Sequence, residues 1–519
     1  MRLDGNVKIT YNYCRNSVRR GWQFTRKRSI MKYMLFLTAL LTVSAVVLIL
    51  VLNGKDSAQA GLRAAQAADG LDHYSYELVF RPESDELAAT LTLRYTNRTK
   101  DTQSDIVLRT WAGAYRQYET SPASIDELFD ACYPEGFSEG GISIEGIWWN
   151  DAIVSYSFDD EASTVLRIPV GTLAPSESGT LRLRCRIHVP HCAHRFGVSD
   201  GIYQFGNALP VLSVWQDSEW RTDEYWPIGD PFMSECANYD VTLSVPKGWM
   251  CAATGSGTSK SADGDRTLYT FHADAVREFG FALSDKWQNA EKKLGGITVT
   301  AYALSRDGAK KAIDYAVKVL RYCASHYGDY AYSSFTVCSI DFPFGGMEYP
   351  QLVMISSSCF DKDSADTLEL TLVHETAHQW FYGLVGSDSF NQPWQDETLC
   401  EYTVLRYVKE RYGTDSYRTL RATRVDAAMQ DPLPLAVTPG SPISYYSSYS
   451  AYSSVVYGRG TAFLLDADEM TGKVDAALKA YCEKYAFRIA SRDDLLTTLC
   501  DSCEADLYPL AVDYLDTLM

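Results

Sequence analysis

Two histidines four residues apart on a helical pattern restrict this chain more than any other feature. His374 and His378 lie in the stretch TLELTLVHETAHQWFYGLVG, whose apolar residues keep helical spacing from Leu370 to Leu384. Side chains four residues apart project from one face of a helix, so both imidazoles can bind one metal ion. Glu375 lies beside them, where a carboxylate can act as a general base on water. The stretch therefore predicts a helix that carries part of a metal site.

A carboxylate further along the chain completes the candidate site. Glu397 follows His378 after eighteen intervening residues, in WQDETLCEY at the start of a second helical pattern. Two histidines and one carboxylate leave a fourth coordination position open, which is typical of catalytic rather than structural zinc sites. Apolar and aromatic neighbours of Glu397 indicate that this face is buried. We therefore expect one Zn²⁺ per chain, bound by His374, His378 and Glu397.

The apolar pattern also divides the chain into two folded parts. Short segments over 71–285 alternate between apolar and polar residues, and turn-forming residues separate them. The clearest of these segments are YSYELVF, LAATLTLRYT, STVLRIPV, TLRLRCRIHV, YDVTLSVP and REFGFALS. This pattern predicts an antiparallel β sandwich-like domain. Over 286–519, strand-like segments at 297–304 and 335–344 enclose a helical pattern at 310–327, and further helical patterns follow. The fold class is therefore α+β, with at least two domains.

The first 70 residues carry a signal for membrane topology. Residues 1–32 hold nine basic side chains against one acidic, and residues 33–52 form an uncharged apolar run. A run of ~20 apolar residues is long enough to cross a membrane as a helix. Because the basic flank comes first, we expect 1–32 in the cytoplasm, 33–52 as a transmembrane anchor, 53–70 as a linker and the body outside.

Two alternatives for this region stay open. The run can be a cleaved signal peptide, because the small residues of Ala58-Gln59-Ala60 resemble a cleavage site. Translation can also begin at Met31, which would remove the basic segment before it. In each case the body is expected to be exported.

Charge and cysteine content exclude some classes of function. Beyond residue 32 the chain has 39 basic and 65 acidic side chains, so it repels nucleic acid. Its thirteen cysteines show no zinc-ribbon spacing, although Cys500 and Cys503 form one CxxC pair. A local run of metal-capable groups falls on a strand-and-turn pattern, and we expect it to be structural: His188, His191, Cys192 and His194.

Two further motifs flank the histidine helix. GGMEYP (345–350) precedes it, and VYGRGTAFLLDA (456–467) follows Glu397 by about sixty residues. Together with HETAHQW and WQDETLCEY, these motifs resemble, in the same order, those of the aminopeptidase N family of zinc metallopeptidases, which are gluzincins. The resemblance covers about 71–519. It implies a β-rich N-terminal domain followed by a thermolysin-like catalytic domain.

The resemblance also assigns roles to individual residues. His374, His378 and Glu397 would bind zinc, and Glu375 would be the general base. Tyr457 would hydrogen-bond the oxyanion of the tetrahedral intermediate. The substrate would be held through its free α-amino group and its backbone, by Glu348 and by Gly345, Gly346 and Met347.

The residues alone leave the oxyanion donor and the helper residues open. Five tyrosines from the Ser- and Tyr-rich stretch at 441–457, which we expect to be an irregular loop, have suitable hydroxyls: Tyr445, Tyr446, Tyr449, Tyr452 and Tyr457. A segment that resembles the family's cleft-facing loop supplies three further candidates for substrate contact: Tyr203, Gln204 and Asn207.

Some positions depart from the family pattern. Tyr349 and Thr398 stand where Asn and Gly are common, Asp396 replaces Asn, and Arg459 replaces the usual Lys. None of these changes removes a reacting group, but each alters the shape of the pocket. The further C-terminal domains of larger members are expected to be missing.

The expected function is a membrane-anchored zinc aminopeptidase that acts on peptides with a free N-terminus. A zinc endopeptidase, or another zinc hydrolase on the same scaffold, is the alternative, and a non-catalytic binding protein is the third hypothesis. An endopeptidase has no need of Glu348, so this residue separates the two proteolytic hypotheses.

Overall fold

The computed structural model describes residues 61–518, apart from 262–263, 362–364 and 431–436. These residues belong to one compact unit that begins at Ala60. The expected cytoplasmic tail, the expected anchor at 33–52 and most of the expected linker lie outside the described residues. In the part of the chain that the structure describes, no helix has the length and apolar character needed to span a bilayer.

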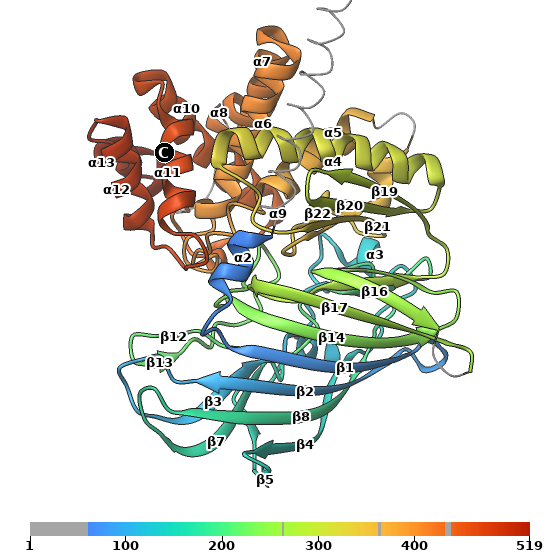
Figure 1. Ribbon diagram of the computed structural model, residues 1–519. Coiled ribbons are helices and arrows are strands. Elements are labelled where there is room, and N and C mark those ends of the chain that lie inside the picture. Colours follow the sequence, from blue (N-terminus) through green and yellow to red (C-terminus); the bar gives the residue numbers. More distant parts are fainter. Residues whose placement is uncertain (1–60, 262–263, 362–364, 431–436, 519) are drawn as a thin grey trace, which may run out of the picture. The chain divides into compact units, whose positions relative to one another are not determined.

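The N-terminal part is built on an eight-stranded sheet, in the order β16-β17-β14-β1-β2-β8-β4-β5 (Figure 1). Its strands are β1 (His73–Arg81), β2 (Glu86–Thr96), β4 (Gly141–Trp149), β5 (Ala152–Ile153), β8 (Ser178–His188), β14 (Ala237–Pro246), β16 (Ser256–Ser261) and β17 (Arg266–Val276). Neighbours are antiparallel, except for the parallel pair β1 and β14. Strand side chains alternate between two faces, and β1 accordingly buries Tyr74, Tyr76, Leu78 and Phe80.

Three smaller sheets complete this part, in the orders β15-β18-β10-β9, β11-β3-β7-β6 and β12-β13. Their strands, with one short helix, are β3 (Gln103–Arg109), α3 (Phe129–Cys132), β6 (Ser157–Phe158), β7 (Val165–Leu173), β9 (Phe196–Ser199), β10 (Ile202–Phe205), β11 (Val211–Leu212), β12 (Trp215–Gln216), β13 (Glu219–Trp220), β15 (Met250–Ala253) and β18 (Phe281–Ser284). The predicted β-rich N-terminal domain is confirmed. The segment REFGFALS forms a strand only over its last four residues.

The described part of the linker expected over 53–70 is ordered against the body. Residues Leu62–Ala67 form helix α2, which packs against the body and buries Ala64. The Ala64 N–H donates to the carbonyl of Ala331 at 3.4 Å, and the Asn238 side chain donates to the carbonyl of Ala68 at 2.9 Å. The small side chains that suggested a free linker instead allow this close approach.

The second part begins with a five-stranded sheet, in the order β19-β20-β21-β23-β22. Its strands are β19 (Gln288–Leu294), β20 (Ile297–Ala303), β21 (Ser334–Ile340), β22 (Gly346–Met347) and β23 (Leu352–Ser356). β20, β21 and β23 run parallel, and β22 lies antiparallel at the edge. Helix α4 (Arg306–Tyr327) connects β20 to β21, and its first turn is capped by the Ser305 hydroxyl, which accepts from the Gly308 N–H at 3.1 Å.

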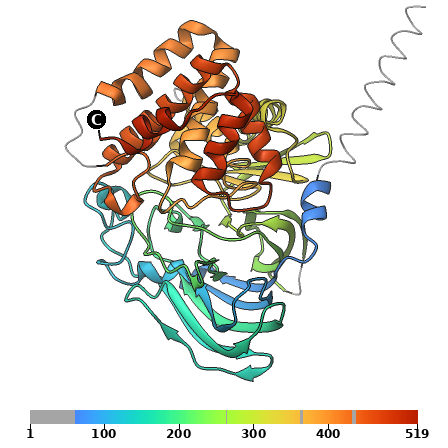
Figure 2. The same ribbon diagram turned by 90° about the vertical axis from the view of Figure 1, so that its left-hand side faces the viewer.

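The rest of the chain is helical. Its helices are α5 (Ala365–Ala377), α6 (Trp394–Tyr412), α7 (Thr414–Arg421), α8 (Ala427–Gln430), α9 (Tyr449–Tyr452), α10 (Gly460–Thr471), α11 (Val474–Lys484), α12 (Arg492–Cys503) and α13 (Tyr508–Ala511). These helices and the eight-stranded sheet lie at opposite sides of the described unit in both views (Figure 2).

Two expectations about the helices are wrong. The histidine helix ends at Ala377 rather than near Leu384. The N–H groups of Gln379 and Trp380 donate three residues back, to Thr376 and Ala377, and the φ of 127° at Tyr382 excludes a helix beyond them. The stretch at 441–457 is irregular only in its first half. From α9 it continues through a π-helical turn (Ser453–Arg459) into α10, and the Ser448 hydroxyl starts this helix by accepting from the Ala451 N–H at 3.1 Å.

Candidate active site

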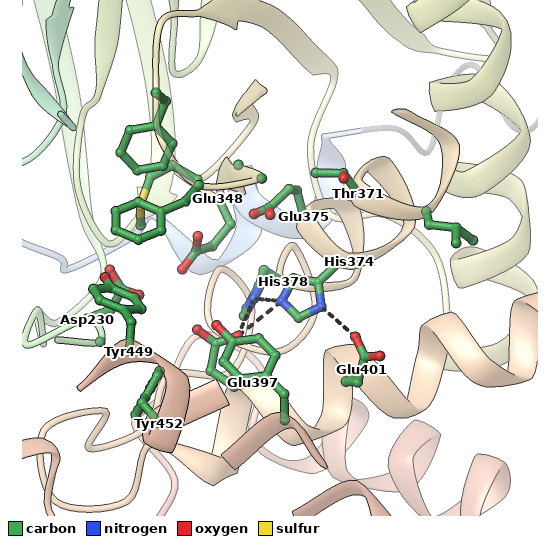
Figure 3. Close-up of a pocket in the computed structure, with 18 of the residues that line it drawn as sticks. Asp230, Glu348, Thr371, His374, Glu375, His378, Glu397, Glu401, Tyr449 and Tyr452 are labelled. Atoms are coloured by element: carbon green, nitrogen blue, oxygen red, sulfur yellow. Dashed lines mark hydrogen bonds and ion pairs between the residues drawn. The ribbon is translucent and has the colours of Figure 1, made fainter. Parts of the chain in front are cut away.

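Helices α5 and α6 bring the three expected metal ligands to one point (Figure 3). The Nε2 atoms of His374 and His378 lie 3.2 Å apart. The Oε2 atom of Glu397 lies 3.0 Å from the first nitrogen and 3.4 Å from the second. His378 lies just past the last residue of α5, where its backbone N–H still faces the carbonyl of His374 at 3.4 Å. The break in the helix therefore does not separate the pair.

The outer nitrogens of both rings also have partners. The Nδ1 atom of His378 lies 3.0 Å from the carbonyl of Phe381, and the Nδ1 atom of His374 lies 3.6 Å from a carboxylate oxygen of Glu401. With their protons on Nδ1, both histidines turn an Nε2 lone pair toward Glu397. Three lone-pair donors that meet in this way repel one another unless a cation lies between them.

The charge around this point also favours a cation. Burial by itself would lower the pKa of His374, but the carboxylates of Glu397 and Glu401 favour positive charge at this point and raise it to about 9. A two-histidine, one-carboxylate set is a typical zinc ligand set. The residues present therefore fit the zinc ion that the sequence predicts.

Glu375 lies beside the ligands in a tightly packed position. It is 5% exposed, and burial raises its pKa to about 7 although both histidines oppose the shift. A Cβ atom on Gly346 would lie 2.6 Å from Cγ of Glu375, so only a glycine fits there. The edge strand β22 thus approaches the carboxylate closely because residue 346 has no side chain.

Glu348 lies one residue beyond β22 and lines the same cavity, which has a volume of about 230 Å³. Its side chain is 6% exposed, and burial raises its pKa well above the usual range, while His378 opposes the shift. Met347 and Gly345 also line the cavity. The structure therefore places the expected amine-binding carboxylate and the metal ligands in one cavity.

The five candidate tyrosines separate into two groups. Tyr445 is 65% exposed, and the hydroxyl of Tyr446 donates to the carbonyl of Thr438. Tyr449, Tyr452 and Tyr457 line the cavity. Of these three, Tyr457 has its ring centroid 5.5 Å from that of His374, at an interplanar angle of 22°. The geometry therefore favours the tyrosine that the family resemblance indicates.

An ion pair that sequence reasoning missed also lines the cavity. Arg195 donates to Asp230, and both residues come from loops of the N-terminal part. Arg195 is 3% exposed, whereas the Asp230 side chain is 22% exposed. Neither residue lies on one of the four motifs around the histidine helix, and these motifs therefore assign neither of them a role. The first part of the chain thus contributes directly to the site.

The departures from the family pattern have local explanations. The ring of Tyr349 fills space that side chains at Gly206 and Gly280 would need, and its hydroxyl donates to Asn207 at 3.0 Å. The Thr398 hydroxyl donates to the carbonyl of Val456 at 2.8 Å, which ties α6 to the turn that carries Tyr457.

The remaining sequence candidates lie outside the cavity. Tyr203 donates to Asp85 and Asn207 donates to Glu278 within the first part of the chain. Gln204 donates to the carbonyl of Asp341 and so connects the first part to the second. The metal-capable run does not converge either: His191 pairs with Asp85 at 3.1 Å, and the buried His194 lies 2.6 Å from the Tyr115 hydroxyl. Among the described residues, all twelve cysteines are free, Cys500 and Cys503 included.

The two-part α+β fold and the His-His-Glu site are similar to those of zinc metallopeptidases. Residues 311–514 match the peptidase family M1 domain. The match assigns residues 311–514, which carry all four motifs, to the family that these motifs resemble.

Curated relatives and solved structures agree with this assignment. The chain is 28% identical over 186 residues to Aminopeptidase RNPEPL1 of Homo sapiens, which covers 33% of this chain and 25% of the relative. It is 25% identical over 276 residues to Leucine aminopeptidase 2 of Neosartorya fischeri, which covers 49% of this chain and 42% of the relative. The chain thus spans less than half the length of these relatives. An M1 zinc metallopeptidase from Deinococcus radiodurans shares the fold, with a TM-score of 0.61, 17% identity and coverage of 86% of this chain and 94% of that one.

Proposed function

We propose that the protein is a zinc aminopeptidase that removes single residues from the free N-terminus of peptides. The observation that carries this proposal is the buried Glu348 carboxylate in the same cavity as the His374, His378 and Glu397 ligand set. A zinc site alone is indifferent to where a peptide bond lies along a chain. A carboxylate close to it selects the bond that follows a charged amino group.

The residues around the metal site have separate roles in the proposed reaction. The three ligands would hold the zinc ion, which supplies a Lewis acid for the scissile carbonyl and for the attacking water. Glu375 accepts the proton of that water and returns it to the leaving amine. The Tyr457 hydroxyl donates a hydrogen bond to the oxygen on which negative charge develops. Glu348 pairs with the substrate ammonium, and the free edge of β22 aligns the substrate backbone as an added strand.

The test compares free and N-acetylated tripeptides with the full-length, zinc-loaded protein. The wild type should hydrolyse the free peptides and spare the acetylated ones. Glu348→Gln keeps the volume of the side chain but removes its charge. This variant should lose roughly 10–10³-fold in kcat/KM on free peptides at unchanged zinc content, because a charge-assisted hydrogen bond is lost. Equal rates on free and acetylated peptides in the wild type would favour the endopeptidase alternative.

We also propose that residues 33–52 anchor the protein in a membrane, with the catalytic body on the extracytoplasmic side. The support is the uncharged apolar run and the basic flank before it. Alkaline carbonate should leave the full-length protein in the membrane pellet. Release into the supernatant, with a new N-terminus near Gly61, would identify a cleaved signal peptide instead.

A further inference from the structure

A second cavity, of about 700 Å³, adjoins the active-site cavity. The two cavities share three lining residues, Glu401, Arg424 and Tyr457. The second cavity is otherwise lined by small and polar side chains from α8, from Thr423 in the π-helical turn before it (Ala422–Asp426), and from the 450–454 segment. No part of the reaction described above uses this space.

The position of the second cavity follows from the order of groups around the ligands. Glu348 and Asp230 lie on one side of the two histidines, and Glu401 lies on the other (Figure 3). A substrate whose amino group is held by Glu348 and whose scissile bond lies at the ligands can continue toward Glu401 and Arg424, which line the same cavity. The second cavity adjoins the active-site cavity at these two residues.

Arg424 gives this cavity a specific chemistry. Its Nη1 atom donates to both carboxylate oxygens of Glu401, at 2.9 and 3.1 Å. Its Nε and Nη2 donors have no hydrogen-bond partner among the described residues, and the side chain is 41% exposed. An arginine has five donors in a planar fork that fits a carboxylate, so Arg424 can bind a second carboxylate while it keeps Glu401.

The other walls fit the same kind of ligand. Arg424 is the single cationic side chain among the described residues that line the second cavity, and the single acid, Glu401, is paired with it. The Ser454 hydroxyl is buried without a hydrogen-bond partner among the described residues, and Ser453 and Thr423 add further hydroxyls. Apart from Tyr457, no lining side chain is large and apolar. The cavity is therefore suited to a polar, anionic chain end rather than to a hydrophobic side chain.

The site is also close to the ligands. Only one side chain, Glu401, separates Arg424 from the ring of His374, since Glu401 lies 3.6 Å from that ring. An extended chain advances ~3.3 Å per residue, so about two or three residues beyond the scissile bond reach from the ligands to Arg424.

We propose that Arg424 and the second cavity bind the C-terminal carboxylate of the substrate, so that the protein acts on short peptides of about three or four residues. This inference rests on the proposed aminopeptidase function and names its substrate class. It predicts a cavity that is acidic at the amino end of the substrate and basic at the carboxyl end.

The experiment compares tripeptides with a free and with an amidated C-terminus, using the full-length zinc-loaded protein. The wild type should prefer the free acid by about 10–100-fold in kcat/KM, the scale of a charge-assisted hydrogen bond. Arg424→Gln should reduce this preference to about one, by lowering the rate on the free acid alone. Equal loss on acid and amide would mean that Arg424 acts only through Glu401 and His374, and it would overturn the proposal.

A second pair of variants avoids the contact with Glu401. Ser453→Asp places a negative charge in the cavity and should weaken hydrolysis of the free acid without affecting the amide. Ser447→Asp adds the same charge at an exposed position outside both cavities and should change neither. If Ser453→Asp affects acid and amide alike, the carboxylate is bound elsewhere.

Binding can be measured without turnover in a Glu375→Gln background. By calorimetry, the free-acid tripeptide should bind about 10–100-fold more tightly than its amide. A wild type that cleaves octapeptides faster than tripeptides contradicts the substrate class but leaves the aminopeptidase function intact. A wild type that cleaves no free-amine peptide contradicts the function itself.

Discussion

Glu375 is packed between the metal ligands and the edge strand, so its chemistry can be changed without disturbing the ligands. Glu375→Gln keeps the shape of the side chain and removes its capacity to accept a proton. We expect kcat to fall by roughly 10²–10⁴-fold, the usual contribution of general acid–base catalysis, while zinc content stays at one per chain. Steady-state kinetics and metal analysis on the same preparation measure both quantities. A turnover number close to that of the wild type would contradict the proposed mechanism.

Gly346 provides a second test at the scale of single residues. An added methyl group would lie 2.6 Å from Cγ of Glu375 and would displace that carboxylate or strand β22. Misplacement of a catalytic group by about 1 Å can cost ~10²-fold, and we expect a loss of that order in kcat for Gly346→Ala. The matched variant is Gly345→Ala, whose methyl group would meet Thr371 at 3.3 Å, and it should lose much less. If the two variants lost kcat equally, the loss in Gly346→Ala would not come from displacement of Glu375.

Neighbouring strands β14 and β17 carry an exposed ionic cluster. Asp240 and His272 are directly opposite in the antiparallel ladder, and the His272 Nδ1 atom lies 2.7 Å from Asp240. Burial by itself would lower the pKa of His272, but hydrogen bonds and charges from Asp240 and Asp274 raise it. The stabilisation is therefore complete below the unfolded pKa of ~6.5 and is lost as pH rises through the higher folded pKa.

This linkage predicts a small, pH-dependent effect of His272→Gln. Both side chains are more than half exposed, so the pair is worth only ~0.2–1 kcal/mol. The urea midpoint of the variant should fall below that of the wild type at pH 5.5 and approach it at pH 8.5. His188→Gln, at an exposed position on β8, serves as the control. If the difference between the urea midpoints of the wild type and the variant grew as pH rises, the prediction would be wrong.

The sequence predicts a helix or a strand well where the spacing of its apolar residues matches the face that the element buries. β1, β20, β21 and α4 all lie where the alternation or the helical spacing indicates. The end of α5 is missed because the N–H groups after it donate three residues back and Tyr382 has a φ of 127°, although the apolar spacing continues. The helix at 449–459 is missed because its stability comes from packing of Tyr452, Val455 and Val456, which a Ser- and Tyr-rich composition does not reveal.

The same contrast holds for the site. The ligands, Glu375 and Glu348 lie on local motifs, so the sequence indicates them directly. Asp230, Arg195 and Arg424 reach the cavity from segments outside the four motifs, and only the tertiary fold brings them there. Contacts between distant segments depend on the whole chain, and no local pattern encodes them.

At the scale of the whole molecule, the metal connects α5 to α6 and should stabilise the fold. Binding at 1,000 times Kd adds ~4 kcal/mol, and each kcal/mol shifts Tm by roughly 2–4 °C in a large domain. Removal of zinc by a chelator should therefore lower Tm by at least several degrees, with recovery when zinc is restored. Glu397→Ala should abolish the difference between the two states. An unchanged Tm in the chelated wild type would show that the site does not hold a tightly bound ion.

The cysteines offer a way to follow how this fold opens. Eleven of the twelve described thiols are buried, and Cys500 alone is partly exposed. A thiol reagent can therefore label the native protein at Cys500, whereas the other described sites react only when the chain around them opens. The buried thiols include Cys185 in β8 and Cys482 in α11, one in each part of the chain. Labelling rates read by mass spectrometry would show which part opens first, without any added probe.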